Sequence, residues 1–236
     1  MDGDGFARLH AANLAALQEV LARAGGWPFE RGDGWVAADA AAATRFFSFT
    51  VLTCDGAEPA ATVYDGRSGP AGWVEMDLWG RPAPGDVRTP LLMRRDPAPL
   101  PPPDPRVVVA RTLDQLTAAE RALAVGLEAP ALAGVLGPGL LDAPVACAYD
   151  RDEQAVSVAF DDGTSIGVYL VGTATDARGQ GLGTAVTAAS MAALPLRPAL
   201  LTATTMGPPS YERLGFRVIG RATMRLRERR SNAPRR

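Results

Sequence analysis

Six residues near the middle of the second half of the chain have the composition of a phosphate-binding turn. The segment Arg178-Gly-Gln-Gly-Leu-Gly183 follows the apolar run Gly167–Thr173, which is typical of a β-strand, and precedes residues with helical periodicity. A strand that leads through glycines into a helix start presents backbone N–H groups at the positive end of the helix dipole. This arrangement favours a phosphorylated ligand.

Taken alone, the glycine turn is a weak signal, because such turns are common for steric reasons. It does not match the dinucleotide-binding fingerprint, since Val186 stands where a small residue is required and no ribose-binding acid follows. All 24 basic residues are arginine. The absence of lysine excludes a Walker-type phosphate loop and a Schiff-base mechanism.

Histidine and cysteine chemistry is restricted as well. His10 is the only histidine, so a zinc cluster of several histidines is excluded and any histidine-activated nucleophile would have to use it. It lies in a segment with helical periodicity, where we expect a surface or interface role. Cys54 and Cys147 each lie in an apolar, strand-like stretch, so we expect buried free thiols and no metal site.

A second motif makes the glycine turn specific. The segment Tyr211-Glu-Arg-Leu-Gly215-Phe216 follows the turn after one helical and one strand-like stretch. Together the two motifs resemble those of the GNAT acyltransferases, Arg/Gln-x-x-Gly-x-Gly/Ala and Tyr-x-x-x-Gly-Phe, with Arg178, Gly181 and Gly183 in the first. The resemblance covers about residues 106 to 228. It implies an α/β (α+β) fold with a central, mixed, mostly antiparallel sheet flanked by helices, and acetyl-CoA as cosubstrate.

The resemblance also implies roles for individual residues. Backbone N–H groups after Arg178 would face the coenzyme pyrophosphate, the amide of Val171 would polarise the acetyl carbonyl, and Val171 and Thr173 would pair with the pantetheine arm. The expected coenzyme-binding set is Val171, Gly172, Thr173, Arg178, Gly179, Gln180, Gly181, Leu182, Gly183 and Thr184. Tyr211 matches the general acid that protonates the departing thiolate. The alternatives are ordinary strand residues and a tyrosine that packs on the sheet.

The general base is not identified. Many GNAT relatives carry a glutamate early on the strand that leads into the loop, but the matching position here is Gly167. Asp161, Asp162 and Glu153 lie nearby in the sequence and are equally typical of solvated turns. A bound water is the remaining route for deprotonating an amine, so we assign no base.

The elements that position these motifs follow from periodicity and turn residues. A helix of about five turns is predicted from Phe6 to Leu21, and six prolines in the nine residues 97–105 indicate a stiff spacer. We predict an accessory or reduced GNAT-like α+β domain at 1–96, a linker at 97–105, a catalytic domain at 106–228 and an arginine-rich tail at 229–236. In the first part, strands are predicted at residues 34–38, 46–53, 61–64, 72–78 and 91–93. In the second part, strands are predicted at 107–110, 145–149, 155–160, 166–173, 198–206 and 216–227. The helices predicted there are 113–127, between the first two of these strands, 182–193 before the strand at 198–206, and 208–214 after it.

Composition completes the expectations. The formal net charge is −2, but the last 16 residues hold seven arginines and one glutamate, so the remainder is acidic, which argues against nucleic-acid binding. The first residues lack a secretory signal and no apolar run would span a membrane, so we expect a cytoplasmic monomer or homodimer.

The expected activity is direct acetyl transfer from acetyl-CoA to a small primary amine, and the alternative is an acyl-CoA sensor without turnover. Trp27, Trp35, Trp73 and Trp79 would either wall the acceptor site or form core.

Overall fold

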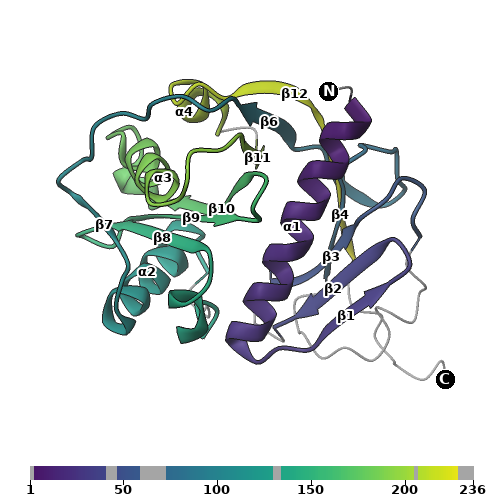
Figure 1. Cartoon of the computed structure of the whole chain (residues 1–236), viewed down its shortest axis with the longest axis horizontal. Coiled ribbons are helices and arrows are strands. Elements are labelled where there is room, and N and C mark those ends of the chain that lie inside the picture. The colour runs from purple at the N-terminus through teal and green to yellow at the C-terminus, as the bar shows by residue number, and fades with distance from the viewer. Residues whose placement is uncertain (1–2, 41–46, 59–72, 130–133, 205–206, 228–236) are drawn as a thin grey trace.

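The chain folds around two mixed β-sheets with one long helix between them (Figure 1). The computed structural model describes residues 3–40, 47–58, 73–129, 134–204 and 207–227. The central helix, α1 (Gly3–Gly25), contacts β2 and β3 of the first sheet and β9 and β10 of the second. The α+β class expected from the sequence is confirmed.

The first sheet has the strand order β1-β2-β3-β4-β13-β5. Its members are β1 (Phe29–Gly32), β2 (Trp35–Asp39), β3 (Ser48–Leu52), β4 (Trp73–Asp77), β5 (Asp86–Arg88) and β13 (Thr223–Arg227). All neighbours are antiparallel except β3 and β4, which run parallel over three residue pairs.

The second sheet has the order β12-β6-β11-β10-β9-β8-β7. Its members are β6 (Leu91–Arg95), β7 (Val107–Val109), β8 (Val145–Asp150), β9 (Ala155–Asp161), β10 (Ile166–Thr173), β11 (Ala199–Ala203) and β12 (Arg217–Arg221). Here the single parallel pair is β10 with β11. Helices α2 (Leu113–Gly126) and α3 (Leu182–Ala192) cover opposite faces of this sheet, and α4 (Pro208–Glu212) lies on the α3 side (Figure 1). The short 3-10 helices are η3 (Pro138–Leu141) and η4 (Thr175–Ala177).

The two sheets repeat one pattern, and each borrows a strand from the other half of the chain. In both, a parallel pair is followed by an inserted antiparallel strand and then an edge strand: β3, β4, β13, β5 in one and β10, β11, β6, β12 in the other. The inserted strand β6 comes from the first half, and β13 comes from the end of the chain. The predicted boundary at 97–105 therefore does not coincide with a division between the two sheets. A strand from before the boundary lies in the second sheet, and a strand from after it lies in the first.

Leucines on α1 form the core between the sheets. Leu14, Leu17 and Leu21 are buried in the same cluster as Val51 of β3 and Val158 of β9. Full burial of one leucine stabilises the fold by roughly 1.5–3 kcal/mol, so this seam contributes substantially to holding the halves together. The helix found is longer than the five turns predicted, because residues 3 to 5 and 22 to 25 extend it.

Several expectations differ from the structure. The predicted last strand, 216–227, is two strands in different sheets, separated at Ala222. Strands β1 and β5 have no predicted counterpart, and the predicted strand at 61–64, like the tail at 229–236, lies outside the described residues. Cys147 is buried as expected, whereas Cys54 is exposed. In the described part of the chain, no helix is both long and apolar enough to cross a membrane.

Candidate active site

The site begins where β10 and β11 separate. The two strands pair from Ile166 with Ala199 to Val168 with Leu201, and β10 then continues without β11 to Thr173. Its ladder with β9 passes from Tyr169 directly to Gly172, so neither Leu170 nor Val171 has a paired residue there. Leu170 has a φ of +51°, which is strained for a leucine. A bulge of this kind redirects the backbone at the open end of a parallel strand pair.

The glycine turn forms as the sequence predicts. Gly179 and Gly181 both have a φ of +80°, a left-handed conformation that glycine adopts without a Cβ clash. Gly181 is the N-cap of α3, no side chain caps this end, and the first helical hydrogen bond is donated by the amide of Ala185 to the carbonyl of Gly181. The preceding amides of the first turn have no intrahelical acceptor, so this helix start is suited to an anion.

Two other glycines allow close approaches to the end of β10. A Cβ on Gly183 would lie 3.1 Å from Oγ1 of Thr173, so this glycine brings α3 against the strand. A Cβ on Gly172 would lie 2.8 Å from the carbonyl carbon of Gly126, at the end of α2. The end of β10 is therefore held between two helices by contacts that larger residues would prevent.

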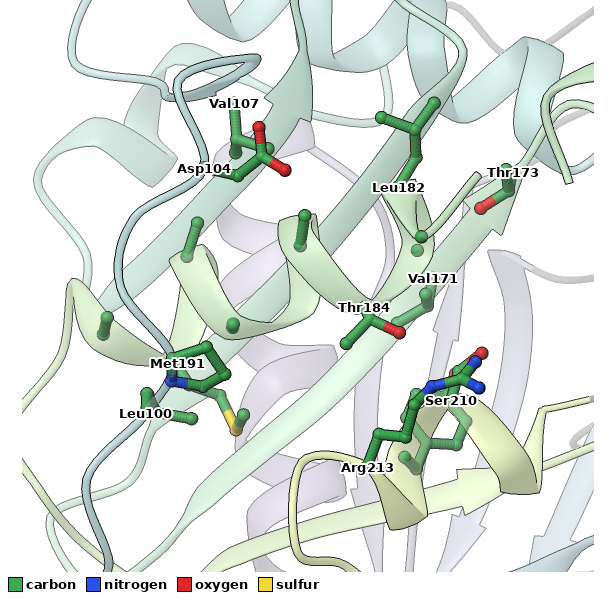
Figure 2. Close-up of a pocket in the computed structure, with 18 of the residues that line it drawn as sticks. Leu100, Asp104, Val107, Val171, Thr173, Leu182, Thr184, Met191, Ser210 and Arg213 are labelled. Atoms are coloured by element: carbon green, nitrogen blue, oxygen red, sulfur yellow. The ribbon is translucent and has the colours of Figure 1, made fainter. Parts of the chain in front are cut away.

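These elements line one cavity of about 1570 Å³, together with α4 and the proline-rich segment (Figure 2). Of the predicted coenzyme-binding residues, nine lie in its wall: Val171, Gly172, Thr173, Arg178, Gly179, Gly181, Leu182, Gly183 and Thr184. Gln180 is not among the lining residues, and its side-chain amide donates to the carbonyl of Asp176 at 3.4 Å. Figure 2 shows Ser210 and Arg213 of the α4 region across the opening from Thr184 and Val171.

Tyr211 lies in the same wall, on α4. Its ring packs edge-on against Phe216 with centroids 6.1 Å apart, and it borders the apolar cluster beneath α3. Burial raises the pKa of the Tyr211 phenol to about 12. Tyr211 packs on the sheet and also lines the cavity, so its position is compatible with either of the two roles considered for it.

The position of the missing glutamate is filled from α1. A Cβ on Gly167 would lie 2.1 Å from Oδ1 of Asn13 and 2.4 Å from the hydroxyl of Tyr169. The Tyr169 hydroxyl donates to Asn13 Oδ1 at 2.7 Å, and Asn13 Nδ2 donates to the carbonyl of Ser165 at 3.0 Å. No side chain larger than hydrogen fits at position 167 while this hydrogen-bonded group is in place.

The three nearby acids are engaged elsewhere and do not line the cavity. Asp161 pairs with Arg197, Asp162 accepts the amides of Thr164 and Ser165, and Glu153 accepts two hydrogen bonds from Arg121. The hydrogen bond from Arg121 lowers the pKa of Glu153. None of the three is placed to accept a proton from a molecule in the cavity.

Two carboxylates are found in the described wall of the cavity, and both are paired. Arg106 lowers the pKa of Asp104 to about 2. Glu128, with a φ of +53°, accepts from Oγ1 of Thr175 at 2.7 Å and from Arg178 at 3.3 Å. The Arg178 Nε also donates to the carbonyl of Thr173 at 3.2 Å, so this guanidinium fastens the loop to α2 and β10.

The wall is rich in arginine. Its six arginines are Arg95, Arg106, Arg111, Arg178, Arg197 and Arg213. Arg213 and Arg111 have no carboxylate partner among the described residues. Sequence reasoning missed Arg213, although it stands two residues after Tyr211, and it missed the walls supplied by Glu128 and the proline-rich segment. An arginine-rich cavity beside an uncapped helix start is electrostatically suited to a polyanion.

Other candidate residues lie away from this cavity. His10 is fully buried against Phe6 and Tyr169, so it belongs to the contact between α1 and the second sheet and not to the surface. All four tryptophans are in the described part of the chain, and none of them lines the cavity. Trp73 is buried and Trp27 packs on Phe47, which agrees with the alternative that the tryptophans form core. The described residues contain no group of three or more histidine, cysteine or acidic side chains that would hold a metal.

Comparison with known proteins finds the same architecture in solved structures. Neither a protein-family profile nor a curated protein sequence matches the chain. A GCN5-related N-acetyltransferase from Kribbella flavida superposes with a TM-score of 0.59 at 20% identity, covering 94% of this chain and 97% of that one. A GNAT-family protein from Novosphingobium aromaticivorans has a TM-score of 0.56 at 22% identity, covering 86% and 91%. Because the likeness spans both sheets, the chain has the fold of the GCN5-related N-acetyltransferases in a tandem arrangement.

Proposed function

We propose that this protein is an acetyl-CoA-dependent N-acetyltransferase that acts on a primary amine of a small molecule. The observation that carries the proposal is one cavity that joins the open end of the β10 and β11 pair, the uncapped start of α3 and the half-buried Tyr211. An anion site, a bulged strand and a protonated phenol would serve to bind the coenzyme, polarise its thioester and protonate the leaving thiolate.

In the proposed complex, the coenzyme diphosphate lies on the amides at the start of α3. The pantetheine arm lies along Val171 to Thr173, on the side of β10 that no longer pairs with β11, and the amide of Val171 donates to the thioester carbonyl. Tyr211 supplies the proton to the leaving thiolate. Its pKa of about 12 keeps the phenol protonated at neutral pH, so it is available as a donor when the thiolate forms. Because the pKa of a thiol is near 8.5, the transfer is completed by the proton that the attacking amine loses, which returns to the phenolate.

The alternative is an acyl-CoA-binding protein without turnover. The observation that favours it is the filled position at Gly167, because the hydrogen-bonded group of Asn13 and Tyr169 replaces the carboxylate that many relatives place there. With no assigned base in the cavity wall, transfer depends on water or on an acceptor that arrives as the free amine.

A thiol-release assay separates the two functions. Acetyl-CoA is incubated with the protein and a panel of primary amines, and free coenzyme A is measured with a thiol reagent, while calorimetry measures coenzyme binding. Amine-dependent release supports the transferase, and the rate should rise with pH as the acceptor loses its proton. Tight binding without release at any pH favours the binding protein. Absence of binding contradicts both.

A further inference from the structure

Arg95, contributed by the first half of the chain, is a buried cation in the wall of the proposed active site. It ends β6, is 4% exposed and lines the cavity. Among the described residues its guanidinium has no carboxylate partner, and its hydrogen bonds all go to backbone carbonyls. Burial lowers its pKa. A buried charge without a counter-ion is unfavourable unless its hydrogen bonds are satisfied, so the position calls for a specific role.

The hydrogen bonds of Arg95 connect two separate segments at the cavity. Its Nε donates to the carbonyl of Leu214 at 2.6 Å, at the end of the α4 turn. Its Nη2 donates to the carbonyls of Ala98 at 2.6 Å and Pro99 at 2.9 Å, at the start of the proline-rich segment. Ala98 and Pro99 line the cavity themselves, whereas Leu214 does not and directly follows the lining residues Ser210, Tyr211 and Arg213.

Leu214 links Arg95 directly to the turn that carries Tyr211. The amides of Leu214 and Phe216 both donate to the carbonyl of Tyr211, at 2.9 and 3.1 Å. Gly215 between them has a φ of +86°, and a Cβ added there would lie 3.8 Å from Nε of Arg95. The Tyr-x-x-x-Gly-Phe segment is therefore closed on itself, and the Arg95 guanidinium adds a hydrogen bond from β6 to its turn, beside the direct pairing of β12 with β6.

Arginine is suited to this place because its planar guanidinium has five donors in fixed directions. The backbone of Arg95 is held in turn, since β6 lies between β11 and β12 and Arg95 is in register with Ala199. A lysine would supply a single ammonium centre and would not reach both segments with the same geometry.

We propose that Arg95 is a positioning residue, which sets the place of the Tyr211 phenol by holding α4 and the proline-rich segment at a fixed separation. The inference rests on the proposed function. Through the inserted strand β6, the first half of the chain thus supplies part of the catalytic geometry of the second half.

The test compares Arg95→Met and Arg95→Lys with a neighbouring control. Arg94→Gln is the control, because Arg94 lies on the same strand, does not line the cavity and pairs with Asp96. We expect kcat to fall about 10- to 100-fold in both Arg95 variants, with the dissociation constant for coenzyme A changed less than about 3-fold, since the phosphate site is on α3. The control should stay within about 2-fold of the wild type.

A spectroscopic readout keeps the test independent of turnover. With tyrosines labelled at Cζ, the Tyr211 carbon resonance, assigned from Tyr211→Phe, reports the ring environment and the phenol pKa. In Arg95→Met we expect the resonance to shift and the pKa to fall below that of the wild type, because a displaced ring is less buried. A wild-type protein without transfer activity contradicts the proposed function alone. An unchanged Tyr211 resonance, or a loss of kcat fully explained by unfolded protein, overturns the role of Arg95.

Discussion

At the scale of single residues, Tyr211 is the side chain whose loss should separate chemistry from binding. Replacing it with phenylalanine removes the proton donor and leaves the packing on Phe216 intact. We expect kcat to fall about 10²-fold or more with little change in coenzyme affinity. Steady-state kinetics and calorimetry measure the two effects. Tyr149→Phe, outside the cavity wall, is the control, and equal activity of both variants would remove Tyr211 from the mechanism.

Arg213 should recognise the charged nucleotide end of the coenzyme. It is exposed and faces the opening in Figure 2, whereas Tyr211, two residues earlier, is directed inward. We expect Arg213→Gln to weaken binding of coenzyme A about 3- to 10-fold and of 3′-dephospho-coenzyme A less, because one charge-assisted hydrogen bond at an exposed site is lost. Arg217→Gln is the matched control outside the cavity. Equal weakening of both ligands would assign Arg213 to the diphosphate instead.

His10 makes the stability of the fold depend on pH. Burial lowers its pKa to about 3, from 6.5 in an exposed chain, and neither ring nitrogen has a hydrogen-bond partner among the described residues. The unfolded chain therefore binds a proton that the folded chain does not, so stability is complete above pH 6.5 and falls as the pH drops toward 3. We expect a loss of about 2–3 kcal/mol between pH 7 and 4.5.

Denaturant unfolding at a series of pH values measures this dependence. His10→Leu removes the titrating group from the same apolar position, so most of the slope between pH 7 and 4.5 should disappear in that variant. A slope that the substitution leaves unchanged would assign the acid sensitivity to carboxylates.

At the scale of elements, the glycine turn can be tested apart from the fold. Gly181→Ala places a Cβ at a φ of +80°, which costs about 1–2 kcal/mol and distorts the start of α3. We expect coenzyme affinity to fall about 10-fold. Gly163→Ala is the control, because its φ of +92° imposes comparable strain in a turn outside the cavity. Similar thermal destabilisation with a loss of affinity in Gly181→Ala alone is the expected result, measured by calorimetry.

The local parts of the site were predictable, because their geometry follows from neighbouring residues. A few consecutive residues determine each of these parts: the left-handed glycines 179 and 181, the helix after them and the turn at Gly215. The bulge at Leu170 was not, because nothing in an apolar strand distinguishes a strained leucine from a regular one. The sequence shows that Gly167 stands where many relatives have a glutamate. It does not show that Asn13, more than 150 positions earlier, fills the space beside this glycine.

The pairing partners of the strands could not be predicted from the sequence either. Residues 216–227 are predicted as one strand, and only the two sheets show that this stretch is two strands, β12 in one sheet and β13 in the other, separated at Ala222. The strand predicted at residues 91–93 belongs to the first part by its position in the sequence, although β6, which contains it, pairs with β11 and β12. Pairing between distant segments depends on the whole arrangement and leaves no local pattern.

At the scale of the whole molecule, the last strand decides whether the first sheet is complete. Deleting residues 229–236 should leave the melting temperature and coenzyme binding unchanged, because the tail is expected to be solvated. Deleting residues 223–236 also removes β13, which lies between β4 and β5, and leaves two open strand edges. We expect this deletion to cause aggregation or to lower the melting temperature by many degrees. Light scattering measures the aggregation, and calorimetry measures the melting temperature. A stable monomer without β13 would show that the first sheet does not need it.

The interleaving of β6 and β13 amounts to a domain swap closed within one polypeptide. Each half donates a strand to the sheet of the other, so the covalent connection through residues 97–105 is one of several links between them. A protein cut between Leu100 and Asp104 keeps Arg95 with its carbonyl partners Ala98 and Pro99 on the first fragment and the glycine turn on the second. Two separately expressed fragments divided there should therefore reassemble by complementation into one particle.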